Sequence, residues 1–142
     1  MSVDFIRMYA DRTHHGKEED ILFRALQDRP LSAEERTVVD ELMAEHVRAR
    51  QLTKQVVTGI ETHAAAGSGG TDMVLAALEQ LCLLYPAHIE KEDKRLFHQV
   101  MRYFTRDEMD RMLEEFREFD RQLIHERYAA RIDEMQRAAA GR

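Results

Sequence analysis

The sequence predicts an all-α protein, an antiparallel four-helix bundle, and three observations carry this prediction. No segment alternates apolar and polar residues with the period of a β-strand. Only two prolines and six glycines interrupt the chain. These breaks leave four helical segments, and their short connections favour antiparallel neighbours; the segments lie near residues 3–28, 33–65, 71–104 and 106–138. We expect residues 1–142 to form a single domain, since a chain of this size can bury its own core.

Turn and capping residues mark the ends of these helices. Pro30 lies in the first connection, and Ser32 begins the second helix as a predicted N-cap. Glu35, three residues after Ser32, completes a predicted capping box. Residues 67–70 read Gly-Ser-Gly-Gly, which is typical of a flexible loop. Thr105 begins a second predicted capping box, of the form Thr-x-x-Glu, ahead of the last helix.

Apolar residues recur at helical spacing and predict which faces are buried. In the second segment the stripe consists of Val38, Leu42, Ala49, Val56 and Ile60. In the third segment it consists of Val74, Leu78, Leu81, Tyr85, Leu96 and Tyr103. Cys82 is the one cysteine, so an internal disulfide is excluded. Its leucine neighbours predict that it is a buried small apolar residue rather than a nucleophile.

Composition excludes several classes of partner. The net charge of −6 argues against a nucleic-acid groove, because such a groove needs a basic stripe. No apolar run approaches the roughly 20 residues of a membrane span, and no signal peptide opens the sequence. We therefore expect a cytoplasmic protein with no membrane or nucleic-acid partner.

One ten-residue phrase occurs twice, as HHGKEEDILF at residues 14–23 and as HIEKEDKRLF at residues 88–97. In the second copy, His88 and Glu92 are four residues apart and therefore share one helix face. This face also carries Leu81, Tyr85 and Leu96, so both polar residues are predicted to point inward. An ionised glutamate in such a place is costly unless a positive partner meets it.

The first copy leaves two alternatives open. The early apolar residues of its helix favour His15 and Glu19 as the inward pair, and the later ones favour His14 and Glu18. The shared Leu-Phe ending sets the same register in both copies, so we assign the inward positions to His14 and Glu18. His46 lies within the apolar stripe of the second helix, and Glu45 lies near that face.

Three imidazoles and two carboxylates are thus predicted to converge from three helices. His/Glu pairs at i, i+4 on facing helices are how bundles build dinuclear metal sites. A single His/Glu pair at this spacing is usually a surface pair. Two such pairs at the same positions of a repeated ten-residue motif, together with His46, favour a metal site. Two bridging carboxylates with terminal histidines suit a pair of iron ions with an oxo or hydroxo bridge better than one tetrahedral zinc. Zinc or no metal are the alternatives.

The three motifs HHGKEEDILF, AEHVRAR and HIEKEDKRLF, in this order, resemble the hemerythrin-like, or HHE cation-binding, family over nearly the whole chain. The resemblance implies a hemerythrin-like bundle and a non-haem di-iron centre bridged by two carboxylates and an oxygen atom. It implies these ligands: His14, Glu18, His46, His88 and Glu92. Members of the family carry, store or sense dioxygen, respond to nitric oxide or peroxide, sense iron, or repair damaged iron centres.

The chain departs from the family pattern at its start. Family members usually begin with another helix that carries a histidine ligand, whereas Met1 comes shortly before His14, so this helix is expected to be absent. His125, beside the stripe residue Ile124 of the last helix, is a candidate replacement ligand; a flank histidine beside Glu126 is the structural alternative. An exposed apolar groove in a shortened bundle would favour a homodimer.

The sequence predicts a di-iron protein that binds or senses dioxygen or a related small oxidant, rather than an enzyme acting on an organic substrate. An enzyme that scavenges peroxide or nitric oxide, or repairs iron centres, is one alternative. It would need an open coordination position and a nearby proton donor, for which Tyr9 and Tyr85 are candidates. A zinc-bound or metal-free interaction module is the other alternative.

Overall fold

The computed structural model describes residues 12–140, with side chains described for residues 12–123 and Arg137. Every regular element in this part of the chain is helical, which confirms the predicted fold class. The chain divides into two compact units, Met1–Thr105 and Arg106–Arg142. Helix α6 (Arg106–Ala140) belongs to the second unit. The single domain and the antiparallel arrangement of four helices stay predictions.

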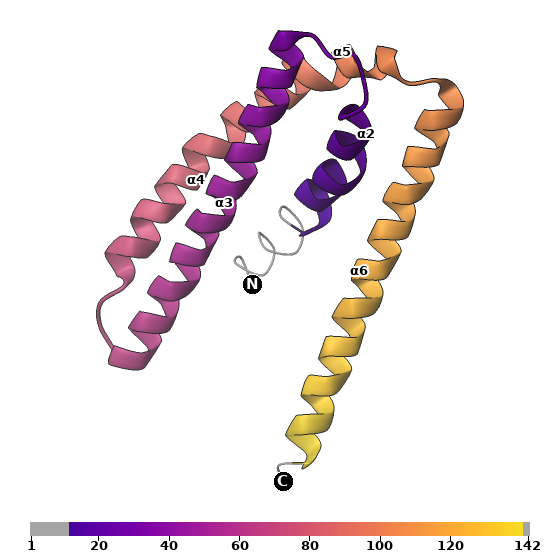
Figure 1. The fold of residues 1–142 in the computed structure, drawn as a ribbon. Coiled ribbons are helices and arrows are strands. Elements are labelled where there is room, and N and C mark those ends of the chain that lie inside the picture. Colours follow the sequence, from indigo (N-terminus) through magenta and orange to yellow (C-terminus); the bar gives the residue numbers. More distant parts are fainter. Residues whose placement is uncertain (1–11, 141–142) are drawn as a thin grey trace. The chain divides into compact units, whose positions relative to one another are not determined.

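The first unit contains the N-terminal helix and a long helical hairpin. The N-terminal helix includes η2 (Glu18–Phe23) and α2 (Arg24–Leu26), and residues 3–11 of the predicted segment lie outside the described residues. Helix α3 (Ala33–Ala66) and helix α4 (Thr71–Lys91) lie side by side (Figure 1). Helical structure continues after α4 through η3 (Glu92–Phe97), α5 (His98–Val100) and η4 (Met101–Tyr103). These boundaries agree closely with the predicted second and third segments.

The start of α3 is stabilised by the predicted capping box. The backbone N–H of Ser32 donates to Glu35 Oε2 at 2.8 Å, and the backbone N–H of Glu35 donates to Ser32 Oγ at 3.2 Å. Glu35 also accepts hydrogen bonds from the hydroxyl of Tyr103, at 2.8 Å, and from Nη2 of Arg102, at 2.9 Å. The cap therefore ties the start of α3 to the end of the helical run that begins with α4.

The turn between α3 and α4 depends on glycine. Gly67 ends α3 with φ 67° and donates its N–H to the carbonyl of His63 at 2.9 Å. Gly70 precedes α4 with φ 77°, a conformation that glycine adopts without the penalty of a Cβ. A Cβ on Gly70 would overlap the Gly59 carbonyl. The two helices therefore meet backbone to backbone at this end of the hairpin.

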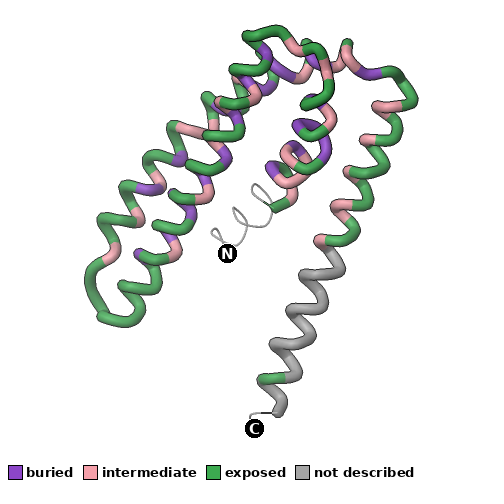
Figure 2. The backbone as a smooth tube through the Cα atoms, viewed as in Figure 1, coloured by how far each residue is buried: buried purple, intermediate pink, exposed green. Residues whose placement is uncertain are grey.

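Buried positions follow the facing sides of α3 and α4 (Figure 2). Four of the predicted stripe residues of α3 are buried as expected: Val38, Leu42, Ala49 and Val56. The prediction for Ile60 is wrong, because its side chain is 47% exposed. Gly59 takes the buried position at this turn of the helix, where the start of α4 leaves no room for a side chain.

The prediction that Cys82 is buried is also wrong, because this residue is exposed. The buried stripe of α4 passes through Leu81, and the next residue in an α-helix lies about 100° further round the axis. Helix α4 also exposes three other large apolar residues, Leu75, Leu83 and Ile89. This helix therefore contains more apolar residues than its buried face can hold.

Two apolar layers enclose the polar part of the interior. One layer lies toward the glycine turn and consists of Ala49, Leu52, Val56, Ala77 and Leu81. On the other side are buried residues that include Leu26, Val38, Leu42, Leu96 and Val100. His46 lies between these layers on α3, and His88 with Glu92 lies between them along the α4–η3 run. None of the described helices combines the length and apolar character needed to cross a membrane.

We expect that Gly59→Ala will destabilise the protein by about 1–3 kcal/mol, because the added methyl group overpacks the hairpin. A Cβ there would lie 2.6 Å from Cγ2 of Val74 and 2.7 Å from the backbone oxygen of Gly70. This clash outweighs the gain in helix propensity of about 1 kcal/mol. Urea unfolding measures the effect, with the exposed neighbour Thr58→Ala as the control. A Gly59→Ala protein as stable as the wild type would contradict the close approach.

Candidate metal centre

Two groups of buried side chains in the described residues have the composition of a metal site. The first comprises Glu18, His46, His88 and Glu92, and the second comprises His15, His46 and His88. Within each group, one ligand atom from every residue lies within 4.8 Å of those of the others. The two groups share His46 and His88. The cluster thus draws on the N-terminal helix, on α3 and on the α4–η3 run.

Both copies of the repeated phrase depart from α-helical geometry at this cluster. Glu18 is the first residue of η2 and Glu92 is the first residue of η3, and both segments are π-helices that end at the phenylalanine of the phrase. A π-helix has a wider turn than an α-helix and occurs frequently at functional sites. The internal repeat is therefore a repeat of backbone geometry as well as of sequence.

Two imidazole nitrogens lie close together within the cluster. Nε2 of His46 lies 3.2 Å from Nε2 of His88, and both rings are buried. On the far side of each ring, Nδ1 meets a carboxylate: Glu19 Oε1 lies 2.7 Å from His46 Nδ1, and Glu45 Oε2 lies 2.8 Å from His88 Nδ1. An ionised carboxylate only accepts hydrogen bonds, so each Nδ1 must carry the proton. Nε2 of His88 also lies 2.9 Å from Glu92 Oε1, so a proton or a metal ion is needed at this nitrogen. Without one, the lone pairs of the two Nε2 atoms would face each other.

Glu18 and Glu92 bring two carboxylates to the same place, and both are buried. Burial raises the pKa of Glu18, and the nearby Glu92 carboxylate raises it further. Burial also opposes ionisation of Glu92, but the imidazoles of His14 and His88 outweigh it and hold its pKa below the usual range. Among the described residues, no hydrogen bond reaches either oxygen of Glu18, and His46 Nε2 lies 3.4 Å from its Oε2. This carboxylate has capacity left for a cation.

The structure distinguishes His14 from His15. The side chain of His14 is 49% exposed, and its Nε2 lies 3.4 Å from Glu18 Oε1 and 3.8 Å from Glu92 Oε2. His15 is 1% exposed, and its ring is stacked on that of His46 with centroids 3.9 Å apart. Burial and the neighbouring imidazoles lower the pKa of His15 to about 3, so its ring is neutral at neutral pH. His15 therefore joins His46 and His88 in the cluster, while His14 lies at its edge.

Neither predicted pairing of the first helix matches this arrangement completely. The helix contributes His15 from one alternative and Glu18 from the other, while Glu19 is bonded to His46 from outside the cluster. Glu45, noted from the sequence only as lying near the buried face, has the corresponding place beside His88. The signal for both glutamates was present in the sequence as the second Glu of KEED and the Glu of AEH.

The remaining predicted site residues have different outcomes. His125 lies in α6, and its side chain is outside the described residues, as is all of Tyr9. Tyr85 is partly buried on α4, with its ring centroid 6.3 Å from that of His15. The candidate proton donor Tyr85 thus lies beside the cluster.

The donor set fits a metal ion with mixed nitrogen and oxygen preference. Imidazole and carboxylate ligands together suit iron, zinc and related first-row metals, whereas calcium and magnesium prefer oxygen alone. Removing these groups from water without a counter-charge is costly, and a metal ion satisfies the facing nitrogens and the carboxylates together. The arrangement can therefore hold a cation in an enclosed interior.

Comparison with known proteins agrees with this chemistry. The family model described as the hemerythrin HHE cation-binding domain matches residues 2–100. No curated protein and no solved structure matches the chain. The matched region contains both copies of the repeated phrase and every residue of the two buried groups. The chain belongs to the hemerythrin HHE cation-binding domain family.

Proposed function

We propose that this protein holds a non-haem di-iron centre in the buried His/Glu cluster and uses it to bind or sense dioxygen or a related small oxidant. The single observation that carries the proposal is the meeting of His46 Nε2 and His88 Nε2 at 3.2 Å, with each Nδ1 hydrogen-bonded to a carboxylate. This arrangement presents two ring nitrogens to one point in a buried, largely apolar setting. It is the arrangement expected of histidines that are ligands.

Two iron ions are favoured over one by the overlap of the two groups. His46 and His88 belong to both, and each group contributes its own further ligands, His15 in one and Glu18 with Glu92 in the other. A carboxylate has two oxygens and can bridge two cations, so Glu18 and Glu92 suit the bridging positions, with an oxo or hydroxo group as a third bridge. When bound, such a centre supplies redox-active metal ions with affinity for dioxygen.

The protein's own residues provide the surroundings that such a centre needs. Apolar layers on both sides of the cluster limit access of water, and His14 lies half-exposed at the edge of the cluster. His125 as a further ligand and the homodimer both stay predictions from the sequence.

Scavenging of peroxide or nitric oxide is the second candidate function, and the position of Tyr85 beside His15 favours it. A phenol near the cluster is a possible source of protons for reduction, which simple binding does not require. Steady-state consumption of peroxide or nitric oxide by the iron-loaded protein, reduced in a Tyr85→Phe variant, would distinguish this function from binding or sensing.

Metal content and thermal stability test the primary proposal. Protein purified without affinity metals is expected to hold two iron ions per chain and to show an optical spectrum that changes on exposure to dioxygen. Metal at 100 times its Kd should add about 2.7 kcal/mol to the free energy of unfolding, which raises Tm by several degrees over a chelated sample. His46→Ala should lose this rise, and the exposed His98→Ala should keep it. Zinc alone, or equal Tm with and without metal, would contradict the proposal.

The affinity for metal should rise with pH. Burial is the largest influence on the pKa of His88 and lowers it, but hydrogen bonds to Glu92 and Glu45 outweigh burial and raise this pKa above 6.5. The protonated ring stabilises the metal-free protein below pH 6.5, and this stabilisation is lost as pH rises through the raised pKa. A metal ion at Nε2 must displace that proton, so affinity should increase about tenfold per pH unit while His88 is protonated.

Competition with a chelator of known affinity at pH 6, 7 and 8, using Zn²⁺ and correcting for protonation of the chelator, measures this dependence. His98→Gln is the control and should show the wild-type slope. An affinity that does not change between pH 6 and pH 8 would show that no proton is displaced.

A further inference from the structure

The two histidines at the centre of the cluster are each supported from outside in the same way. His46 Nδ1 is bonded to Glu19, and His88 Nδ1 is bonded to Glu45. Glu19 and Glu45 do not belong to either buried group of ligands among the described residues. Their side chains are 21% and 26% exposed, so they lie at the boundary between the cluster and solvent.

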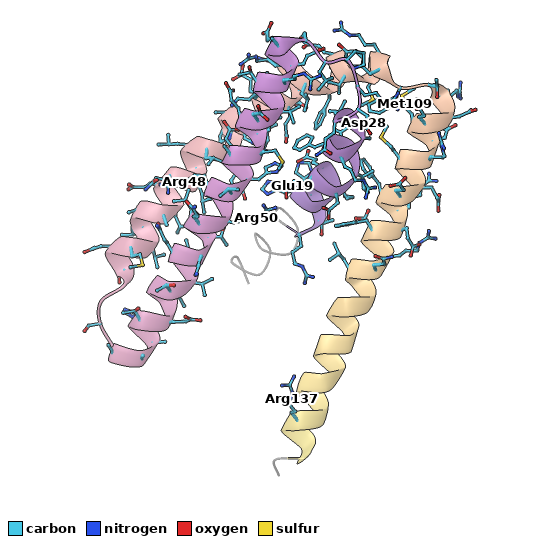
Figure 3. All side chains as sticks on the ribbon, in the orientation of Figure 1. Glu19, Asp28, Arg48, Arg50, Met109 and Arg137 are labelled. Atoms are coloured by element: carbon cyan, nitrogen blue, oxygen red, sulfur yellow. The ribbon has the colours of Figure 1, made fainter. Side chains whose placement is uncertain are left out.

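Each supporting carboxylate also meets a cation. Arg50 Nη2 donates to Glu19 Oε1 at 2.8 Å, and Glu19 and Arg50 are labelled in Figure 3. Lys91 Nζ lies 2.5 Å from Glu45 Oε1 and 2.8 Å from Glu41 Oε2. Each cation fixes the position of its carboxylate and offsets its negative charge. Glu19 and Glu45 therefore do not compete with Glu18 and Glu92 as metal ligands.

The two sets of contacts have the same order along the chain. The carboxylate comes from the helix that precedes the histidine, while the cation comes from the histidine's own helix. Thus the N-terminal helix supplies Glu19 to His46 on α3, and Arg50 follows His46 by four residues. Helix α3 then supplies Glu45 to His88 on α4, and Lys91 follows His88 by three residues. Each helix therefore orients the histidine of the next.

We propose that Glu19 and Glu45 are positioning residues that hold His46 and His88 in the tautomer with the proton on Nδ1, so that both Nε2 atoms are directed at one metal centre. The inference rests on the proposed function, because it assigns a role toward the metal. The chemical basis of this role is that the carboxylate accepts a hydrogen bond from Nδ1–H. The lone pair of Nε2 is then available to bind a metal ion. Loss of such a partner typically weakens metal binding about 10- to 100-fold.

Exchangeable Zn²⁺ affinity tests the inference. Glu19→Ala and Glu45→Ala should each weaken Zn²⁺ binding about 10- to 100-fold. The corresponding Gln variants should lose less, because the amide oxygen still accepts a hydrogen bond from Nδ1 while the charge is gone. Glu34→Gln is the matched control, since Glu34 forms an ion pair with Arg95 at 3.5 Å from α3 to η3 but touches neither histidine. Its affinity should stay within about twofold of the wild type.

NMR of the zinc-loaded protein with ¹⁵N-labelled histidine separates positioning from general stabilisation. The wild type should show slowly exchanging Nδ1–H signals from both His46 and His88. Glu19→Ala should lose only the signal of His46, and Glu45→Ala only that of His88. Unchanged signals and affinities in these variants would overturn the positioning role while leaving the metal centre in place. A wild-type protein that binds no Zn²⁺ or Fe²⁺ would overturn the proposed function and this inference with it.

Discussion

Two imidazole nitrogens, Nε2 of His46 and Nε2 of His88, face each other 3.2 Å apart inside the protein. Since both rings offer Nδ1 to a carboxylate, the lone pairs of the two Nε2 atoms would repel each other at a place where little water can screen them. A cation turns this repulsion into attraction. In a metal-free chain a proton can serve, as the raised pKa of His88 indicates. A metal ion would also satisfy the buried carboxylates of Glu18 and Glu92, which one proton cannot do.

The rest of the first unit can be understood as support for this contact. The π-helical segments η2 and η3 each begin at a cluster glutamate, and the apolar layers on both sides remove the site from water. Glu19 and Glu45 connect successive helices through the histidines that they hold. The capping box at Ser32 and the glycine turn at residues 67–70 set the lengths of α3 and α4, and these lengths bring His46 level with His88. Metal affinity and stability of the fold are therefore expected to change together.

Much of this organisation could be predicted from the sequence because it depends on local rules. Helix boundaries follow from capping residues and glycines, and the repeated phrase marks the two segments that bring Glu18, His88 and Glu92 to His46. The sequence favoured His14 as the inward histidine, whereas His15 is the buried one, because a constant rotation of 100° per residue does not hold where the helix becomes π-helical. Cys82 was assigned to the core from its leucine neighbours and Ile60 from its helical spacing, yet burial depends on which face a neighbouring helix covers. Glu19 and Glu45 stand beside motif residues in the sequence, but their contacts with His46 and His88 join different helices, and the spacing along one helix does not specify such contacts.

Anomalous diffraction from crystals of the iron-loaded protein, recorded above and below the iron absorption edge, tests the central claim most directly. Two iron peaks are expected within coordination distance of the side chains of Glu18, His46, His88 and Glu92, with His15 beside them. Iron bound only at the protein surface, or an ordered cluster in which His46 Nε2 and His88 Nε2 remain in contact with no metal between them at saturating iron, would contradict it.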